Sequence, residues 1–288
     1  MKAPPRNDSS LEKGLSAFPP IHAEIGNFLQ EFRSASLFES QPPQEFPDSI
    51  AGFLESGRSV LRASEYRFAP KACKEVASVL LDLLRKRLPD REDALGRIQG
   101  AFAAGEIPPK DFVSLVFRGR SEEILGAAKR LGVDEGLLTF IAVYLARPFR
   151  AQAALELTRE VDLGKWHRGH CPVCGNWPAL AHIQSVEGRR TLWCLLCGTH
   201  WPYGRLQCPY CLNEDQEALN LISAEAEPSF RAHTCARCGK YIKEVMSALS
   251  AEAFSFDVFY LGTRALDLLA ASAGFAPHPL LAAASVDP

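Results

Sequence analysis

The sequence lacks an excess of charge of either sign. Its 288 residues contain 32 Lys and Arg against 34 Asp and Glu, which gives a formal net charge of −2. A protein that coats nucleic acid or an anionic membrane surface needs a strong basic excess. We therefore expect neither kind of surface, whereas the 47% of apolar residues is enough for an ordinary buried core.

Long apolar runs and several common motifs are also missing. No stretch approaches the roughly 18–20 consecutive apolar residues of a membrane span, and the N-terminus has no uninterrupted apolar segment of a secretory signal. We therefore expect a soluble cytoplasmic protein. The sequence also lacks the nucleotide loops G-x-x-x-x-G-K-[ST] and G-x-G-x-x-G, as well as G-x-S-x-G and H-E-x-x-H.

The composition changes abruptly near residue 165. Eight of the nine cysteines, all four tryptophans and five of the seven histidines lie between residues 166 and 238. The part before residue 165 reads as helices, and the clearest one spans about Pro70 to Leu88, where Pro89 stops it. Its apolar residues recur at three- and four-residue steps: Cys73, Val76, Val79, Leu80, Leu83 and Leu84.

Further elements follow from caps and breakers. Asp134 can cap a helix that Pro148 breaks or kinks, because proline cannot donate to the helical backbone. After residue 240, Tyr241–Val245 reads as a strand and Ser255–Ala273 as a helix.

We therefore predict an α+β multidomain protein with four parts. Residues 1–165 form a mainly α-helical domain with a loose N-terminal arm. Residues 166–206 and 207–248 form two tandem rubredoxin-like or zinc-ribbon modules, each with a four-cysteine site. Residues 249–288 form a C-terminal helix and tail.

The cysteines of the two ribbons follow one pattern, C-x₂-C…C-x₂-C, at close to the separation of a zinc ribbon. Nineteen residues separate the two pairs of the first unit and twenty-three those of the second. The cytosol keeps protein thiols reduced, so disulfides do not explain this pattern in a cytosolic protein. The predicted metal ligands are Cys171, Cys174, Cys194 and Cys197 in site 1, and Cys208, Cys211, Cys235 and Cys238 in site 2.

The tight turns of these pairs explain the spacing. Two intervening residues let both sulfurs point at one ion, and a glycine after the second cysteine allows positive φ. Gly175, Gly198 and Gly239 fill that place, whereas the third turn has Leu212-Asn213, in which asparagine tolerates a left-handed backbone. Segments of this size rarely hold together by apolar burial alone, so removal of the metal should unfold the region.

Several alternatives stay open for the cysteines. Redox-active dithiols are one, although four tandem pairs without a βαβ pattern favour metal. Pairing of neighbouring turns is the local solution, and an interleaved arrangement is the alternative. Four sulfur ligands suit either zinc or a single rubredoxin-type iron. A site with four protein ligands is closed, which is typical of a structural rather than a catalytic site, so we do not expect an enzyme.

Two other sets of residues have alternative interpretations. Cys73 can be a reactive thiol, but its place on the apolar stripe favours the core. Aromatic residues and arginine are enriched at protein interfaces. We therefore consider that four residues after the second cysteine pair are partly exposed and bind a partner, with core packing as the alternative: His200, Trp201, Tyr203 and Arg205.

The sequence resembles the FdhE family of formate dehydrogenase accessory proteins. The resemblance covers roughly the last 120 residues, continues more weakly into Leu266–Leu269 and Gly274–Pro279, and is only general in the helical half. It is carried by Gly169-His170-Cys171-Pro172-Val173-Cys174-Gly175, Leu192-Trp193-Cys194-Leu195-Leu196-Cys197, Trp201, Arg205, Cys208-Pro209-Tyr210-Cys211, and Cys235-Ala236-Arg237-Cys238-Gly239 with Tyr241-Ile242-Lys243.

This resemblance implies a cytoplasmic factor that binds a formate dehydrogenase catalytic subunit and is needed for its activity or assembly. It also implies two rubredoxin-like sites, with iron as a serious alternative to zinc. A second hypothesis is an electron-transfer or redox-sensing iron protein. The third, a nucleic-acid-binding zinc ribbon, is disfavoured by charge: residues 166–248 hold eight Lys and Arg against seven Asp and Glu, a net charge of +1.

Overall fold

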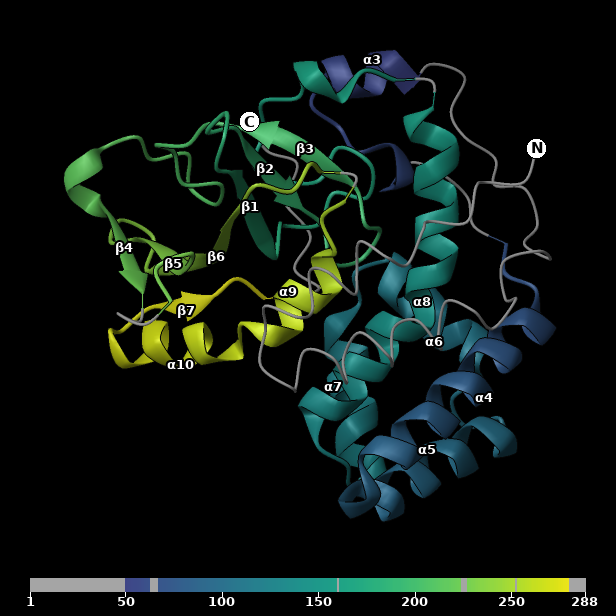
Figure 1. Ribbon diagram of the computed structural model, residues 1–288. Helices are drawn as coiled ribbons and strands as arrows, with labels where there is room; N and C mark the ends of the chain where they lie inside the picture. The colour runs from purple at the N-terminus through teal and green to yellow at the C-terminus, as the bar shows by residue number, and fades with distance from the viewer. Residues whose placement is uncertain (1–49, 63–66, 160, 224–226, 252, 280–288) are drawn as a thin grey trace.

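The computed structural model describes residues 50–62, 67–159, 161–223, 227–251 and 253–279. Within these ranges a helical half packs beside a mixed β-sheet, and two further helices cover one face of that sheet (Figure 1). The predicted α+β class, with a helical N-terminal part followed by the cysteine pairs, is confirmed. The predicted N-terminal arm and the end of the predicted tail lie outside the described residues.

The helical half is built around its longest helix. α8 contacts α4, α6 and α7, so its apolar residues fill the middle of this half. The helices are α3 (Ile50–Glu55), α4 (Pro70–Arg87), α5 (Glu92–Ala104), α6 (Pro109–Phe117), α7 (Ser121–Leu131) and α8 (Glu135–Thr158), with 3₁₀ turns η1 (Val60–Arg62), η2 (Pro89–Arg91) and η3 (Leu163–Lys165). Among the residues described, none of the helices combines the length and the hydropathy that a membrane span requires.

Two predicted helices have the expected local signals. The stripe of α4 that contains Cys73, Val76 and Leu80 is buried, as its periodicity predicts. Asp134 caps α8, because its Oδ1 accepts a hydrogen bond of 2.8 Å from the backbone N–H of Leu137. These caps and stripes fix where the helices begin and which face they bury.

Two other helices differ from the prediction in their continuity. α8 runs through Pro148 to Thr158, so the proline does not break it. The helix predicted over Ser255–Ala273 is divided into α9 (Phe256–Gly262) and α10 (Arg264–Ser272). Thr263 stands between them, and its hydroxyl donates a 2.6 Å hydrogen bond to the carbonyl of Phe259. A hydroxyl that bonds back to the preceding turn commonly bends a helix.

The sheet joins both cysteine-rich segments. Its strand order is β3-β2-β1-β6-β5-β4, with the short β7 paired to β6. Neighbouring strands are antiparallel except that β6 runs parallel to both β1 and β7. The strands are β1 (Leu180–Gln184), β2 (Arg190–Trp193), β3 (His200–Tyr203), β4 (Leu219–Ser223), β5 (Phe230–Cys235), β6 (Lys240–Ser247) and β7 (Ala276–Pro277). The predicted strand at Tyr241–Val245 is therefore the middle of β6.

One face of the sheet is covered by α9 and α10 (Figure 1). Asp267 of α10 accepts hydrogen bonds from two residues of β6, the Tyr241 hydroxyl at 2.8 Å and Lys243 Nζ at 3.1 Å. Lys243 Nζ also donates to the carbonyl of Tyr260 at 2.8 Å. This polar contact holds the C-terminal helices on the sheet and satisfies a lysine that is only 3% exposed.

The opposite face carries a buried ion-pair network. The Arg190 side chain on β2 is fully buried and lies 2.9 Å from Glu244 Oε1 on β6. Arg231 on β5 pairs with the second carboxylate oxygen at 3.2 Å. Arg190 Nη1 also donates 2.9 Å hydrogen bonds to the carbonyls of Gly204 and Gln207. The network therefore ties three strands to the segment that connects the two cysteine-rich units.

We predict that Glu244→Gln destabilises the protein mainly above pH 4.5. Burial opposes ionisation of Glu244, but the charges of Arg190, His233 and Arg231 outweigh it and lower its pKa to about 2. A depressed carboxyl pKa stabilises the folded state above the unfolded value and loses that contribution as the pH falls toward the folded value. We expect a difference on the order of 3 kcal/mol at pH 7 that shrinks between about pH 4.5 and 2.

Chemical unfolding of wild type and Glu244→Gln across this pH range measures the difference. Glu187→Gln is the control, because Glu187 is about half exposed and pairs with the exposed Arg189. A gap between wild type and Glu244→Gln that does not change with pH would contradict the assignment.

Candidate metal centres

The eight clustered cysteines lie in four tight turns, which we call knuckles. The first knuckle (Cys171–Cys174) precedes β1, and the second (Cys194–Cys197) connects β2 to β3. The third (Cys208–Cys211) precedes β4, and the fourth (Cys235–Cys238) connects β5 to β6. Each cysteine-rich unit therefore has the same order of knuckle, strand, strand, knuckle and strand, so the sequence repeat is also a repeat of structure.

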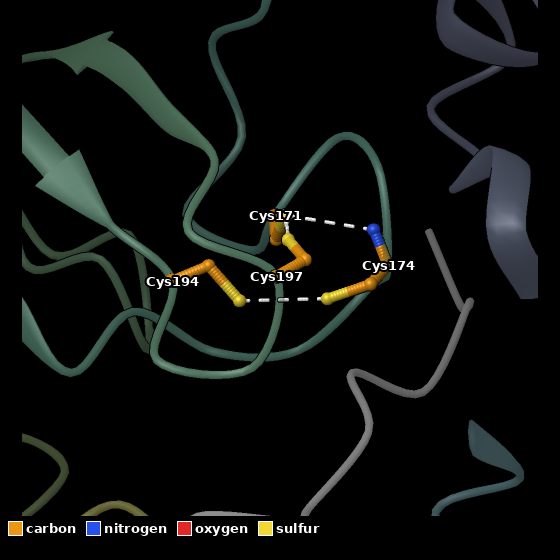
Figure 2. A group of neighbouring side chains, drawn as sticks. All are labelled: Cys171, Cys174, Cys194 and Cys197. Atoms are coloured by element: carbon orange, nitrogen blue, oxygen red, sulfur yellow. Dashed lines mark hydrogen bonds between the residues drawn. The ribbon is translucent and has the colours of Figure 1, made fainter. Parts of the chain in front are cut away.

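Neighbouring knuckles converge on one another. The sulfurs of the first and second knuckles form the first cluster, and those of the third and fourth form the second cluster, with the sulfurs of each cluster within 4.8 Å of one another. Figure 2 shows the first cluster, in which sulfurs of the two knuckles face each other across a small space. This is the local pairing of the four C-x-x-C turns and not the interleaved one.

The sulfur separations fit a tetrahedral ion. Four sulfurs that each lie about 2.3 Å from a tetrahedral ion are about 3.8 Å apart. Cross-knuckle pairs in the second cluster are separated by 3.8 Å (Cys208–Cys238) and 3.7 Å (Cys211–Cys235). In the first cluster the separations are 3.5 Å (Cys171–Cys197) and 3.4 Å (Cys174–Cys194). Both donor sets can therefore hold one zinc or one iron ion as a closed four-sulfur site.

The backbone of the knuckles agrees with the expected turn geometry. The N–H of Cys174 donates to Cys171 Sγ at 3.5 Å (Figure 2), so backbone dipoles face the sulfur. In every knuckle the residue after the second cysteine donates to the carbonyl of the first, at 2.9 to 3.0 Å. Three of these residues are glycines with φ of 70°, 73° and 67°: Gly175, Gly198 and Gly239.

The third knuckle departs from the expectation. Leu212 itself has φ of 60°, so Leu212 and not Asn213 adopts the left-handed backbone. Asn213 has another role: its side-chain amide lies 3.9 Å from Cys235 Sγ, and its carbonyl accepts from the N–H of Cys208 at 2.9 Å. The turn geometry thus overrides the residue preference at position 212.

The first cluster is buried against the helical half. The backbone N–H of Leu61 donates to the carbonyl of Val173 at 2.8 Å, and Arg147 and Arg150 of α8 bring positive charge toward Cys194 and Cys174. Burial raises the pKa of the Cys171 and Cys194 thiols. Four thiolates in this environment need a compensating cation, because burial penalises uncompensated charge.

The third knuckle packs against the chain just before the first knuckle. A Cβ added to Gly169 would overlap the carbonyl oxygen of Pro209, so only glycine fits this approach. The hydroxyl of Tyr210 donates to the carbonyl of Pro178 at 3.1 Å, and its ring lies 5.8 Å from that of Trp177. The two cysteine-rich units are therefore in direct contact near their knuckles as well as through the sheet.

The four residues predicted to bind a partner divide into two pairs. Trp201 and Tyr203 are buried, so the expectation that they are partly exposed is wrong. Both side chains lie on the same face of β3. The Trp201 indole donates to the carbonyl of Arg168 at 3.1 Å, and the Tyr203 hydroxyl donates to the carbonyl of Cys208 at 3.3 Å. His200 is half-buried against the Trp193 ring at 4.4 Å, and Arg205 is exposed. Partner binding by His200 and Arg205 stays a prediction.

Cys73 lies apart from both clusters, on the buried stripe of α4. Burial raises its pKa to about 12, which leaves the thiol protonated and unreactive at neutral pH. The sequence did not indicate the roles of Gly169, Arg190 or Asn213. Their contacts join distant segments, and the sole local signal is that Gly169 stands next to the His170-Cys171 motif.

Comparison with known proteins gives one consistent name. No protein-family model matches the chain. The chain is 25% identical over 264 residues to the FdhE homologue of Aquifex aeolicus, and the aligned region covers 89% of this chain and 87% of that protein. It is 30% identical over 212 residues to the FdhE homologue of Haemophilus ducreyi, covering 72% and 65%. Several other curated FdhE homologues align over half of their own length or less.

The fold is also shared with a solved structure. The crystal structure of the FdhE protein from Pseudomonas aeruginosa matches 96% of this chain and 94% of that chain, with a TM-score of 0.57 and 21% identity. At this identity the match concerns the fold alone. It extends through the helical half, for which the sequence resemblance was only general.

We predict that each cluster binds one metal ion independently. Cys171→Ser removes a ligand from the first cluster and Cys208→Ser from the second, so each variant should carry about one ion instead of two. Cys73→Ala is the control and should keep both ions, because Cys73 lies in the helical core. Elemental analysis of the purified variants measures the metal content, and loss of both ions from either serine variant would contradict independent binding.

We also predict that Gly169→Ala destabilises the protein by about 1–3 kcal/mol, the usual cost of overpacking. The added methyl group must push the third knuckle away from the first cysteine-rich unit. Gly204→Ala is the control, since its Cβ would make an ordinary contact of 3.6 Å with Gln207. Denaturant unfolding measures both, and equal stabilities of the two variants would disprove the close-approach argument.

Proposed function

Because this chain belongs to the FdhE family, we propose that it is a non-catalytic accessory factor, acting in the cytoplasm, that binds a formate dehydrogenase catalytic subunit and supports its activity or assembly. The observation that carries the proposal is the similarity to an FdhE homologue over 89% of the chain. The shared fold supports it, since both the helical half and the sheet have counterparts in the FdhE crystal structure.

The chemistry of the two clusters supports an accessory role. Within the described part of the chain, the groups of metal-ligating residues are two in number, and both consist of four cysteines. Four protein ligands leave no open position for a substrate or an activated water. A bound ion supplies a cross-link that fixes the knuckles, and the cysteines, the N–H···S contact and Asn213 hold the geometry around it.

Metal identity tests the main alternative, an electron-transfer or redox-sensing iron protein. Four sulfurs suit iron as well as zinc. A visible absorption that bleaches on reduction would favour a redox role, whereas a colourless protein loaded with zinc in iron-replete cells would favour a purely structural one. Client binding is compatible with either ion, because it depends on the surface that the clusters hold in place.

The client surface that we propose lies at the outer end of β3. Arg205 and Leu206 are exposed just after the last residue of β3 and directly before the third knuckle. His200, the first residue of β3, is half-buried. An exposed apolar side chain beside an arginine is a common element of protein interfaces.

We predict that the tagged full-length chain co-purifies with a formate dehydrogenase catalytic subunit. Arg205→Glu should weaken the complex about tenfold, because reversing a charge at an interface opposes its electrostatic complementarity. Arg130→Glu, an exposed charge reversal on α7 in the helical half, is the matched control. Absence of any complex, together with normal formate dehydrogenase activity in a strain without this protein, would refute the proposed function.

A further inference from the structure

The two clusters differ in how well they are shielded from solvent. Each cysteine of the first cluster is at most 5% exposed. In the second cluster Cys208 and Cys235 are buried, but Cys211 and Cys238 are only half-buried. One half-buried cysteine comes from each knuckle, so an incoming ligand can reach the second cluster at both of its knuckles.

The surroundings of the clusters explain the difference. Around the first cluster, residues of the helical half form hydrogen bonds with the first knuckle: Leu61 N–H to the Val173 carbonyl at 2.8 Å, and the Ser59 hydroxyl to the Cys171 carbonyl at 3.4 Å. Opening of the first knuckle therefore requires these contacts with the helical half to break. β4 and β5, which flank the second cluster, lie at the end of the sheet away from α8 (Figure 1).

The third knuckle also stores backbone strain. Leu212 occupies the left-handed position that glycine fills in the other three knuckles. An L-residue in this region costs roughly 1–2 kcal/mol relative to its ordinary conformations. The leucine side chain is 54% exposed, so its burial offsets little of that cost. The strain is relieved when the turn opens, and it lies in the knuckle that contains the half-buried Cys211.

From these three observations we propose that the second cluster is the exchangeable metal site, at which external thiol or chelating ligands replace the cysteines, while the first cluster keeps its ion. This inference rests on the proposed metal binding by both clusters. A soft thiolate is the chemical class of ligand that such a site accepts, because it can substitute for a cysteine without changing the donor atom. Exchange proceeds by local opening of the third and fourth knuckles and leaves the sheet and the helical half folded.

The test follows both ions in the intact, metal-loaded chain. Native mass spectrometry counts the ions while EDTA is added, and iodoacetamide then labels the released thiols for peptide mapping. We expect a populated species with one ion, labelled on Cys208, Cys211, Cys235 and Cys238. These cysteines should react roughly tenfold faster than those of the first cluster, because thiol reactivity follows access.

Two outcomes would overturn the inference: first labelling at Cys171, Cys174, Cys194 or Cys197, or loss of both ions in one step. A chain that binds no ions from the start is a different result, because it contradicts the proposed metal binding itself. Native mass spectrometry distinguishes these cases before any labelling.

A pair of leucine variants tests the contribution of strain. Leu212→Gly should slow the loss of the second ion roughly threefold, since glycine adopts the left-handed turn without the steric cost. Leu206→Gly is the matched control, because Leu206 is exposed near the same knuckle and does not have a positive φ. If Leu212→Gly leaves the rate unchanged, or if both variants change it equally, strain at Leu212 does not govern exchange.

Discussion

Each cysteine-rich unit depends on its four converging sulfurs, because about forty residues cannot bury enough apolar surface to fold alone. The knuckles lie where strands begin or connect, so the sulfurs fix the register of those strands. Without a cation the four thiolates of a cluster would destabilise the fold, since burial disfavours the charged form of a thiol. An ion held by each cluster would therefore compensate the thiolate charge and stabilise the strands that the knuckles connect.

The two units become one body through contacts far apart in the sequence. β1 pairs in parallel with β6, Arg190 bridges β2, β6 and the connecting segment, and Gly169 lets Pro209 approach. On the other side, the first knuckle continues into the helical core through Leu61. The first cluster is consequently central to the molecule, whereas the second is peripheral.

Local features of this structure were predictable from the sequence, and non-local ones were not. The periodicity around Val76 and Leu80 and the cap at Asp134 indicate helices because their physics acts within a few residues. The cysteine spacing indicates the two sulfur clusters because two C-x-x-C pairs about twenty residues apart are typical of one four-sulfur site. Continuity through Pro148, burial of Trp201 and the pairing of β1 with β6 depend on neighbours supplied by distant segments. The four-part division of the chain stays a prediction, although the two ribbons share one sheet.

The head-to-tail joining of the repeated units gives the sheet two unlike edges. In the middle of the sheet, the first strand of the first unit (β1) pairs with the last strand of the second unit (β6). The two edge strands are the last strand of the first unit (β3) and the first strand of the second unit (β4), so they correspond to the two strands that pair in the middle. Such an arrangement has no internal stop, and a third unit or another molecule would extend it by the same rule. Pro202, on the edge strand β3, opposes such an extension. The backbone N–H of Cys194 donates to the carbonyl of Thr199, so Thr199 faces β2 with its hydrogen-bonding groups. Because these groups alternate in direction along an antiparallel strand, the backbone nitrogen of residue 202 faces away from β2, and proline has no N–H there. Pro202 thus removes one of the hydrogen-bond donors through which this edge of the sheet could accept a further strand.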